Sequence, residues 1–352
     1  MNPLEHQLQY PHDNTLPALG ESIEVAPGIR WIRMPLPFAL DHINLWLIRD
    51  TYAGRDGWTI VDCGVARDEV KAAWEQVFAT QLDGLPVVRV IVTHMHPDHI
   101  GLAHWLTQRW DVPLQMTMTD FVVAHLHLKG DSSAGGESVA AHFERHGMNN
   151  AEDLEGVRTR KRYYSQLVPS VPPTFIRIVD NDVVRIGNHD WQVIVGYGHA
   201  PEHASFYCRE LNVVISGDMV LPRISTNVAV ADNEPEGNPL QDYLDSLGRY
   251  EHVPADAVVL PSHGRPFVGI HTRIGQQHDH HADHLSRVLA ACDTPKTAFD
   301  MVPVLFKRKL DLHQMTFALG ESIAHMHMLM YNGKLRRQIG TDGVIRFVAV
   351  PR

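Results

Sequence analysis

Four residues able to bind a metal ion lie within one short run of the sequence: His94, His96, Asp98 and His99. They follow residues 87–92, a segment rich in β-branched side chains that is typical of a strand buried on both faces. In an extended chain His94 and His96 turn toward the same side, and Pro97 fixes the next turn so that the other two donors follow as a second pair. We therefore expect two metal sites side by side. Imidazole nitrogen and carboxylate oxygen suit zinc, manganese or iron, and without a thiolate the set does not single out zinc.

Three further donors each follow a short apolar run: His199, Asp218 and His263. The runs, residues 193–198, 213–217 and 258–262, have the composition of strands that end in a turn. Ligands of open α/β sheets bind outside the carboxyl ends of the strands. We therefore expect all seven donors to meet at one edge of the fold.

The elements that position these donors follow from the spacing of apolar residues. Strands are expected at residues 30–34, 43–48, 58–61, 87–92, 176–179, 191–195, 204–208 and 213–216, and helices at residues 68–78 and 100–110. Mixed strands flanked by helices predict a layered α/β architecture.

Four segments are expected along the chain. Residues 1–24 are polar and aperiodic, and are interpreted as an N-terminal extension. Residues 25–277 hold the strands, with residues 125–173 interpreted as an insertion over the site. From residue 278 onward, helices at 282–291, 296–305 and 314–331 precede extended runs at 335–339 and 344–348, which predicts a small winged-helix-like domain over residues 278–352.

Residues 93–101, Thr-His-Met-His-Pro-Asp-His-Ile-Gly, resemble the signature of the metallo-β-lactamase superfamily. Gly198-His199, Gly217-Asp218 and Ser262-His263-Gly264 are similar to its remaining ligand motifs, in their usual order. The resemblance covers roughly residues 25–270 and implies an αββα sandwich and a metal-dependent hydrolase.

The resemblance also implies a role for each donor. It places His94, His96 and His199 on a first metal, places Asp98, His99 and His263 on a second, and lets Asp218 bridge both. Asp62 matches the early strand-end aspartate of the superfamily, which orients the ligands from behind.

The C-terminal region resembles the winged-helix extension of the β-lactamase-like protein 2 subgroup, as do residues 242–247. That subgroup includes thioesterase-like members and an RNA-cleaving member. The chain departs from the antibiotic-hydrolysing enzymes, which are exported and often carry cysteine where Asp218 stands, and from flavodiiron proteins, which carry glutamate where His96 stands. Glu202 occupies a position that is glycine in many relatives.

The expected chemistry is hydrolysis by a hydroxide that bridges two divalent ions, zinc being the first choice and manganese or iron the alternatives. Asp98 and Asp218 are the expected catalytic carboxylates, Asp98 as a proton relay, and His203 is a candidate partner of the ligands or of the substrate. We expect an ester or thioester of a small acyl substrate. A phosphodiesterase or ribonuclease using the same metals is the alternative. A nucleic-acid-binding regulator with a vestigial metal site is a third hypothesis, and the seven intact ligands count against it.

The composition of the chain limits the classes of molecule that we expect it to bind. The chain of 352 residues has a formal net charge of -10, which argues against a general polyanion-binding surface. Without a long apolar span or a secretion signal we expect a cytoplasmic protein with no membrane partner. The three cysteines have no paired spacing and are expected to be free thiols. The terminal domain is expected to pack or to form a homodimer rather than to bind DNA.

Weaker signals concern the substrate. Arg158, Arg160, Lys161 and Arg162 form the densest basic run, beside Tyr163. Tyr163 and Arg223, which follows Asp218 closely, are the candidate substrate contacts. The histidines at positions 278, 280, 281 and 284 suggest a third metal site, but we interpret them as structural residues of the terminal helices.

Overall fold

The computed structural model describes residues 2–129, 135–160 and 162–351. The chain divides into two compact units. The first comprises Met1–Leu128, Ser165–Thr226 and Ser246–Ile274, and the second comprises Lys129–Tyr164, Asn227–Asp245 and Gly275–Arg352. Three helices run across these boundaries: α7 (Tyr163–Leu167), α8 (Pro239–Leu247) and α9 (Ile270–Ala291).

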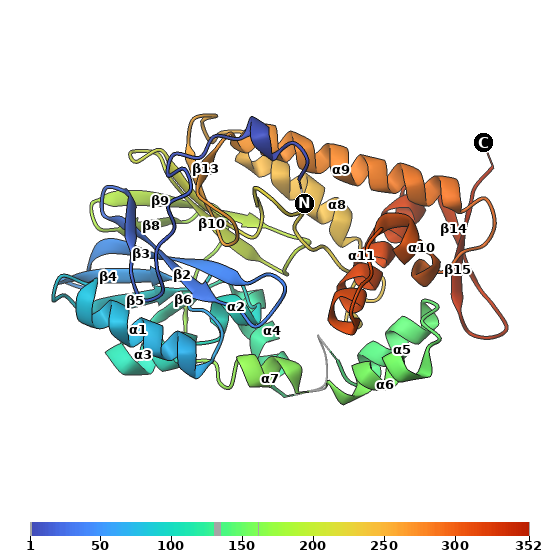
Figure 1. The fold of residues 1–352 in the computed structure, drawn as a ribbon, viewed down its shortest axis with the longest axis horizontal. Coiled ribbons are helices and arrows are strands. Elements are labelled where there is room, and N and C mark those ends of the chain that lie inside the picture. The colour runs from blue at the N-terminus through green and yellow to red at the C-terminus, as the bar shows by residue number, and fades with distance from the viewer. Residues whose placement is uncertain (1, 130–134, 161, 352) are drawn as a thin grey trace. The chain divides into compact units, whose positions relative to one another are not determined.

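A seven-stranded mixed sheet forms one half of the first unit, with its strands side by side in chain order (Figure 1). The strands are β1 (Ile23–Ala26), β2 (Ile29–Pro35), β3 (His42–Tyr52), β4 (Arg55–Val61), β5 (Val87–Ile91), β6 (Leu114–Met116) and β7 (Ile176–Arg177). β4 and β5 are parallel, and Val61 lies opposite Ile91. Asp62 and the run that starts at Thr93 therefore leave the sheet at the same edge.

A six-stranded mixed sheet forms the other half, in the order β13-β12-β11-β10-β9-β8. The strands are β8 (Val183–Ile186), β9 (His189–Gly196), β10 (His203–Cys208), β11 (Val213–Gly217), β12 (Val258–Pro261) and β13 (Phe267–Val268). β11 and β12 are parallel, and Gly217 lies opposite Pro261. His203, which begins the antiparallel β10, pairs with Gly196 at the end of β9. The segments that carry His199, Asp218 and His263 therefore emerge side by side.

The two sheets pack face to face through a shared apolar core. Trp31 and Trp46 from the first sheet lie in one cluster with Trp191 and Phe206 from the second. Burial of such large side chains is the main driving force for the packing. At the edge that carries the donors, the Ala204 N–H donates to the Thr93 carbonyl at 2.8 Å, so the sheets are also hydrogen-bonded there.

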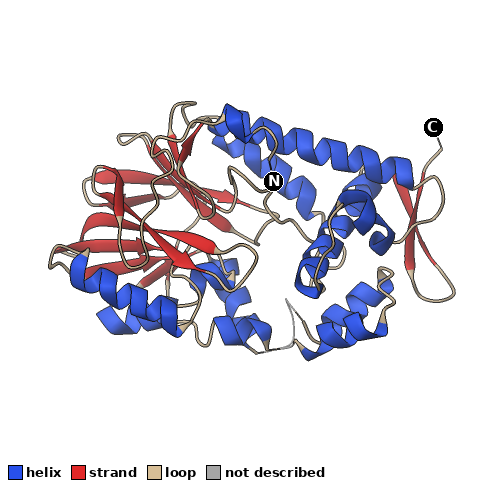
Figure 2. Cartoon of the chain, viewed as in Figure 1, coloured by secondary structure: helices blue, strands red, loops and turns tan. Residues whose placement is uncertain are grey.

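Helices complete the layers of the first unit. α1 (Asp68–Thr80) and α3 (Ala103–Trp110) lie against the seven-stranded sheet (Figure 2), and α2 (Pro97–Ile100) and α4 (Met118–Leu128) follow β5 and β6. Two 3-10 turns, η1 (Glu5–Gln7) and η2 (Gly248–Tyr250), add to this unit. The predicted α/β sandwich is confirmed. The single helix expected at residues 100–110 is instead two helices, because the chain turns between Ile100 and Ala103.

The second unit is mainly helical. It contains α5 (Glu137–Arg145), α6 (Ala151–Thr159), α10 (Ala298–Leu305), α11 (Leu312–Tyr331) and the hairpin β14 (Leu335–Ile339) with β15 (Ile345–Ala349). The prediction that the first terminal helix starts near residue 282 is wrong, because α9 starts at Ile270. The early turns of α9 are polar and show no apolar period, and Arg273 holds them by donating to the Leu221 and Ile224 carbonyls. The winged-helix and insertion assignments stay predictions.

Among the described residues, no helix is both long enough and apolar enough to cross a membrane.

A buried ion pair ties the two sheets together in the first unit. Asp50 in β3 and Arg89 in β5 meet at 2.9 Å, and their side chains are 1% and 3% exposed. The other carboxylate oxygen of Asp50 accepts the Gly187 N–H, between β8 and β9, at 2.6 Å. Because β5 leads into the donor run, this pair supports the strand that presents His94 and His96.

Replacing Asp50 with alanine leaves the Arg89 guanidinium buried without its counter-ion, which costs about 3–5 kcal/mol. We expect urea unfolding followed by tryptophan fluorescence to show that loss of stability. The double variant Asp50→Ala, Arg89→Met removes both charges and is expected to lose less. An equal loss in the single and double variants would mean that the charge of this pair is not what matters.

Candidate metal centre

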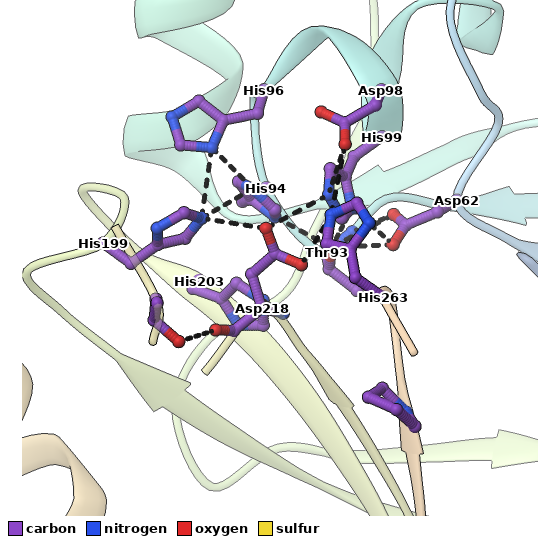
Figure 3. Close-up of polar contacts among 12 residues, drawn as sticks. Asp62, Thr93, His94, His96, Asp98, His99, His199, His203, Asp218 and His263 are labelled. Carbon is purple, nitrogen blue, oxygen red and sulfur yellow. Dashed lines mark hydrogen bonds and ion pairs between the residues drawn. The ribbon is translucent and has the colours of Figure 1, made fainter. Parts of the chain in front are cut away.

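The histidines at the end of β5 point their ring nitrogens at one place (Figure 3). Nε2 of His94 lies 2.9 Å from Nδ1 of His96. Nε2 of His199, which follows β9, lies 3.2 Å and 3.1 Å from these two atoms. A tetrahedral zinc site with metal–nitrogen bonds of about 2.0–2.1 Å has donors about 3.3 Å apart. The three nitrogens are therefore spaced as the ligands of one metal ion are.

A second group of donors lies beside the first. Oδ2 of Asp98 is 3.6 Å from Nε2 of His99 and 3.3 Å from Nε2 of His263. Asp98 and His99 belong to α2, which Pro97 starts and His96 precedes. The short helix turns both side chains back toward the end of β5.

The Asp218 carboxylate contacts both groups. Its Oδ2 is 3.3 Å from Nε2 of His199 and 3.6 Å from Nε2 of His99, and its Oδ1 is 3.4 Å from Nε2 of His263. Two buried atoms here, Oδ1 of Asp218 and Nε2 of His99, have no hydrogen-bond partner among the described residues. Buried polar atoms are rarely left in this state. The donor chemistry, the spacing and these two atoms fit a pair of divalent metal ions.

Asp62 supports the second group of donors through hydrogen bonds to His99 and to the backbone of Thr93. It is buried in the left-handed backbone region, with φ of 63°, directly after β4. Its carboxylate accepts the Nδ1–H of His99 at 2.8 Å and the backbone N–H of Thr93 at 2.8 Å. A histidine that donates through Nδ1 presents Nε2 to the metal, so this contact fixes the tautomer and the ring orientation of His99.

The surroundings of the pocket histidines raise the pKa of two of them and lower the pKa of two others. Burial lowers the pKa of His99, but Asp62, Asp98 and Asp218 outweigh burial and hold that pKa well above its ordinary value. His263 shows the same balance, since Asp218 and Asp98 raise its pKa against burial. Burial and neighbouring imidazoles instead lower the pKa of His94 and His96, that of His96 to about 3. A histidine must be neutral to bind a metal, so His99 and His263 must release a proton and His94 and His96 need not.

His203 lies behind the shared carboxylate. It is completely buried, and its Nε2 accepts the backbone N–H of Asp218 at 3.0 Å. A Cβ added to Gly217, whose φ is 53°, would lie 2.2 Å from that same Nε2. Only glycine allows this approach. A catalytic role for His203 stays a prediction, and its contact is with the backbone that carries Asp218.

Asp120 joins two ligand loops, and sequence reasoning missed it. It is completely buried in the first turn of α4, and it accepts the N–H of Met95 at 2.8 Å and of Glu202 at 2.6 Å. Burial raises its pKa to about 6. These two hydrogen bonds connect the loop of His94 and His96 to the loop of His199. The available signal was an acidic residue opening an apolar run just after a strand.

Asn44 and His42 hold the loop of His263, and sequence reasoning missed them too. Asn44 donates from Nδ2 to the carbonyls of Pro261 and Gly264 at 2.8 Å and 3.0 Å. The Nδ1–H of His263 donates to the carbonyl of His42 at 2.8 Å, which leaves Nε2 for the metal. The signal for Asn44 was an amide side chain inside the apolar run of residues 43–48.

The candidate substrate contacts have other partners. Arg223 forms an ion pair with Glu5 at 3.2 Å and its side chain is half-exposed. Tyr163 belongs to the second unit, where the Arg160 guanidinium lies 4.8 Å from the centre of its ring. Lys161 of the basic run lies outside the described residues. Substrate contact by Arg223 and Tyr163 stays a prediction.

The sequence matches two protein families. Residues 39–263 match the family described as "Metallo-beta-lactamase superfamily", and residues 285–350 match "Metallo-beta-lactamase-like, C-terminal domain". The crystal structure of a beta-lactamase domain protein from Burkholderia ambifaria is 52% identical, with a TM-score of 0.94 over 99% of this chain and 100% of that one.

More distant relatives also cover most of the chain. The metallo-beta-lactamase family protein TTHA1429 from Thermus thermophilus is 27% identical, with a TM-score of 0.76 over 93% of this chain and 100% of that one. The "Probable metallo-hydrolase YqjP" of Bacillus subtilis is 22% identical over 85% of this chain and 91% of its own length.

Asp62→Asn tests the support of His99. The amide is of similar size but has lost the charge, and its NH₂ group faces donors. Losing such a partner costs about 10–100-fold in metal affinity. We expect a loss of that size in competition titrations with a chromophoric chelator. Asp56→Asn, at an exposed aspartate of the same strand β4, is the control and is expected to bind as the wild type does. Equal affinities in all three proteins would contradict the assigned role of Asp62.

Gly217→Ala tests the close approach of His203. The added methyl group displaces the imidazole and the Asp218 backbone that it holds, and overpacking of this kind costs about 1–3 kcal/mol. We expect a lower melting temperature together with weaker metal binding. Gly54→Ala is the matched control, because Gly54 also has a positive φ, 77°, but a Cβ there meets no atom within 4 Å. If Gly54→Ala weakens metal binding as much, backbone strain and not the His203 contact explains the loss.

Proposed function

Because the chain belongs to the metallo-β-lactamase superfamily and is a metal-dependent hydrolase, we propose that it uses two divalent metal ions to hydrolyse an ester or thioester of a small acyl substrate. One observation carries the dinuclear part of this proposal. The Asp218 carboxylate contacts His199 of one donor group and His99 and His263 of the other. A carboxylate placed between the two donor groups would be able to contact both of two adjacent metal ions.

We assign each donor to an ion according to the other donors that it contacts. His94, His96 and His199 would hold one ion, Asp98, His99 and His263 would hold the other, and Asp218 would contact both. Zinc is the ion that we propose, since nitrogen and carboxylate donors in this number suit it. When bound, the ions supply Lewis acidity and lower the pKa of water toward neutrality.

The residues of the chain provide geometry and proton transfer. Asp62 and the His42 carbonyl fix the Nε2 atoms of His99 and His263 by accepting from their Nδ1–H groups. His203 holds the Asp218 backbone. Asp98 is the more exposed of the two metal-facing carboxylates, with 16% of its side chain accessible against 9% for Asp218. Its greater exposure makes Asp98 the carboxylate that we propose as the proton relay.

Charge favours an acyl substrate over a nucleic acid. The net charge of -10 opposes the approach of a polyanion. In the basic run, Arg158 forms ion pairs with Glu137 at 3.1 Å and Glu144 at 3.8 Å. Arg160 is engaged with His313 and the ring of Tyr163. The charge of Arg158 is therefore partly neutralised and the Arg160 guanidinium already has partners, which weakens any binding to a phosphate backbone.

A substrate panel tests this function. Metal-loaded protein is assayed with several acyl-coenzyme A thioesters, a lactone, bis-p-nitrophenyl phosphate and a single-stranded RNA. We expect turnover of thioester or lactone that falls by at least about a thousand-fold in Asp218→Ala, because the shared carboxylate is needed to hold both ions. Asp245→Ala, at an aspartate outside the site, is the control. Turnover confined to the phosphodiester or RNA would replace the acyl substrate by a phosphoryl one.

A further inference from the structure

A second cluster of metal-binding side chains lies in the second unit. His280 and His284 are one turn apart on α9, so they share a face of that helix. Glu321 comes from α11. One donor atom from each of the three residues lies within 4.8 Å of the other two. The rings of His280 and His284 are 4.1 Å apart between their centres, and Nδ1 of His284 is 4.0 Å from Oε1 of Glu321.

The carboxyl group of Glu321 is buried, and no lysine or arginine of the described residues forms an ion pair with it. The residue is 7% exposed, and Oε1 has no hydrogen-bond partner among the described residues. Nδ1 of His284, in a residue that is 6% exposed, is also without a hydrogen-bond partner there. At 4.0 Å the two atoms are too far apart to hydrogen-bond with each other. Burial raises the pKa of Glu321 to about 8. Ionisation of Glu321 is therefore costly while no cation lies beside it, and a bound cation would offset that cost.

The surroundings of the cluster hold it in place. The Nδ1–H of His325 donates to the Glu321 carbonyl at 2.8 Å, one turn back along α11. Nε2 of His325 therefore lacks a proton and accepts from Nδ1 of His281 at 3.2 Å. This second hydrogen bond links α9 to α11 beside the cluster. It keeps the helix that carries His280 and His284 facing the helix that carries Glu321.

We propose that His280, His284 and Glu321 bind a divalent transition-metal ion of the zinc class, at a site distinct from the seven-donor centre. Two imidazoles and one carboxylate are a common ligand set for zinc and for iron(II), with water in the remaining positions. Donors around zinc are about 3.3 Å apart, so the three side chains would draw together by at most about 1.5 Å on binding. The ion would clamp α9 to α11 and so stabilise the second unit.

The test is the zinc content of the full chain after removal of all metal, incubation with excess Zn²⁺ and desalting. We expect Glu321→Gln to retain one zinc fewer per chain than the wild type. Glutamine has the size of glutamate and no charge, so the fold is expected to survive, and far-ultraviolet circular dichroism checks this. His284→Gln removes a different donor and is expected to lose the same single equivalent. His278→Gln is the matched control, since His278 is exposed on the same helix and lies outside the cluster.

A second readout is the melting temperature. Added Zn²⁺ is expected to raise it further in the wild type and in His278→Gln than in Glu321→Gln. The same comparison in an Asp218→Ala background separates this site from the seven-donor centre, because the difference made by Glu321→Gln persists there. Equal zinc contents in the wild type, Glu321→Gln and His284→Gln would overturn the proposal and leave Glu321 as a buried acid without a metal.

Discussion

The Asp218 carboxylate faces ring nitrogens of His99, His199 and His263 at 3.3–3.6 Å, and much of the first unit serves to hold it there. Carboxylates and imidazoles crowded into a pocket away from water are unfavourable unless cations lie among them. The donors that would surround such cations come from both sheets. One sheet supplies the four donors that follow β5, and the other supplies the three that follow β9, β11 and β12. The packing of the sheets therefore sets the distances between donors.

Contacts that hold the two sheets together therefore also affect the distances between the donors. The Ala204–Thr93 hydrogen bond joins β10 of one sheet to the segment that follows β5 of the other, and the Asp120 carboxylate joins the loops of Met95 and Glu202. Asn44 does the same for the loop of His263. The donors follow the ends of β5, β9, β11 and β12, so the packing of these strands positions the donor loops, as efficient catalysis requires.

Sequence reasoning brought the seven candidate donors together because four of them form a dense local pattern and the other three each follow an apolar run that predicts a strand. The alternation of strands and helices predicted the layered α/β architecture, and the resemblance to the superfamily implied the sandwich. Sequence reasoning missed Asp120 and Asn44, because the loops to which each of them hydrogen-bonds are distant in the sequence and meet only in the folded chain. The start of α9 was missed for a similar reason, because its first turns are held by Arg273 and not by an apolar face. The histidines of α9 were interpreted as structural residues because they open the terminal helices, and their spacing gave no sign of Glu321, which lies on another helix.

The central claim is that two metal ions share Asp218. A crystal structure of the zinc-loaded protein, with anomalous data collected on both sides of the zinc absorption edge, tests it most directly. Within the seven-donor pocket we predict two anomalous peaks about 3.5–4 Å apart, as in other two-metal sites. One is expected among His94, His96 and His199, the other among Asp98, His99 and His263, with the Asp218 carboxylate in contact with both. A single peak in this pocket, or two peaks of which only one is bound by Asp218, would contradict it.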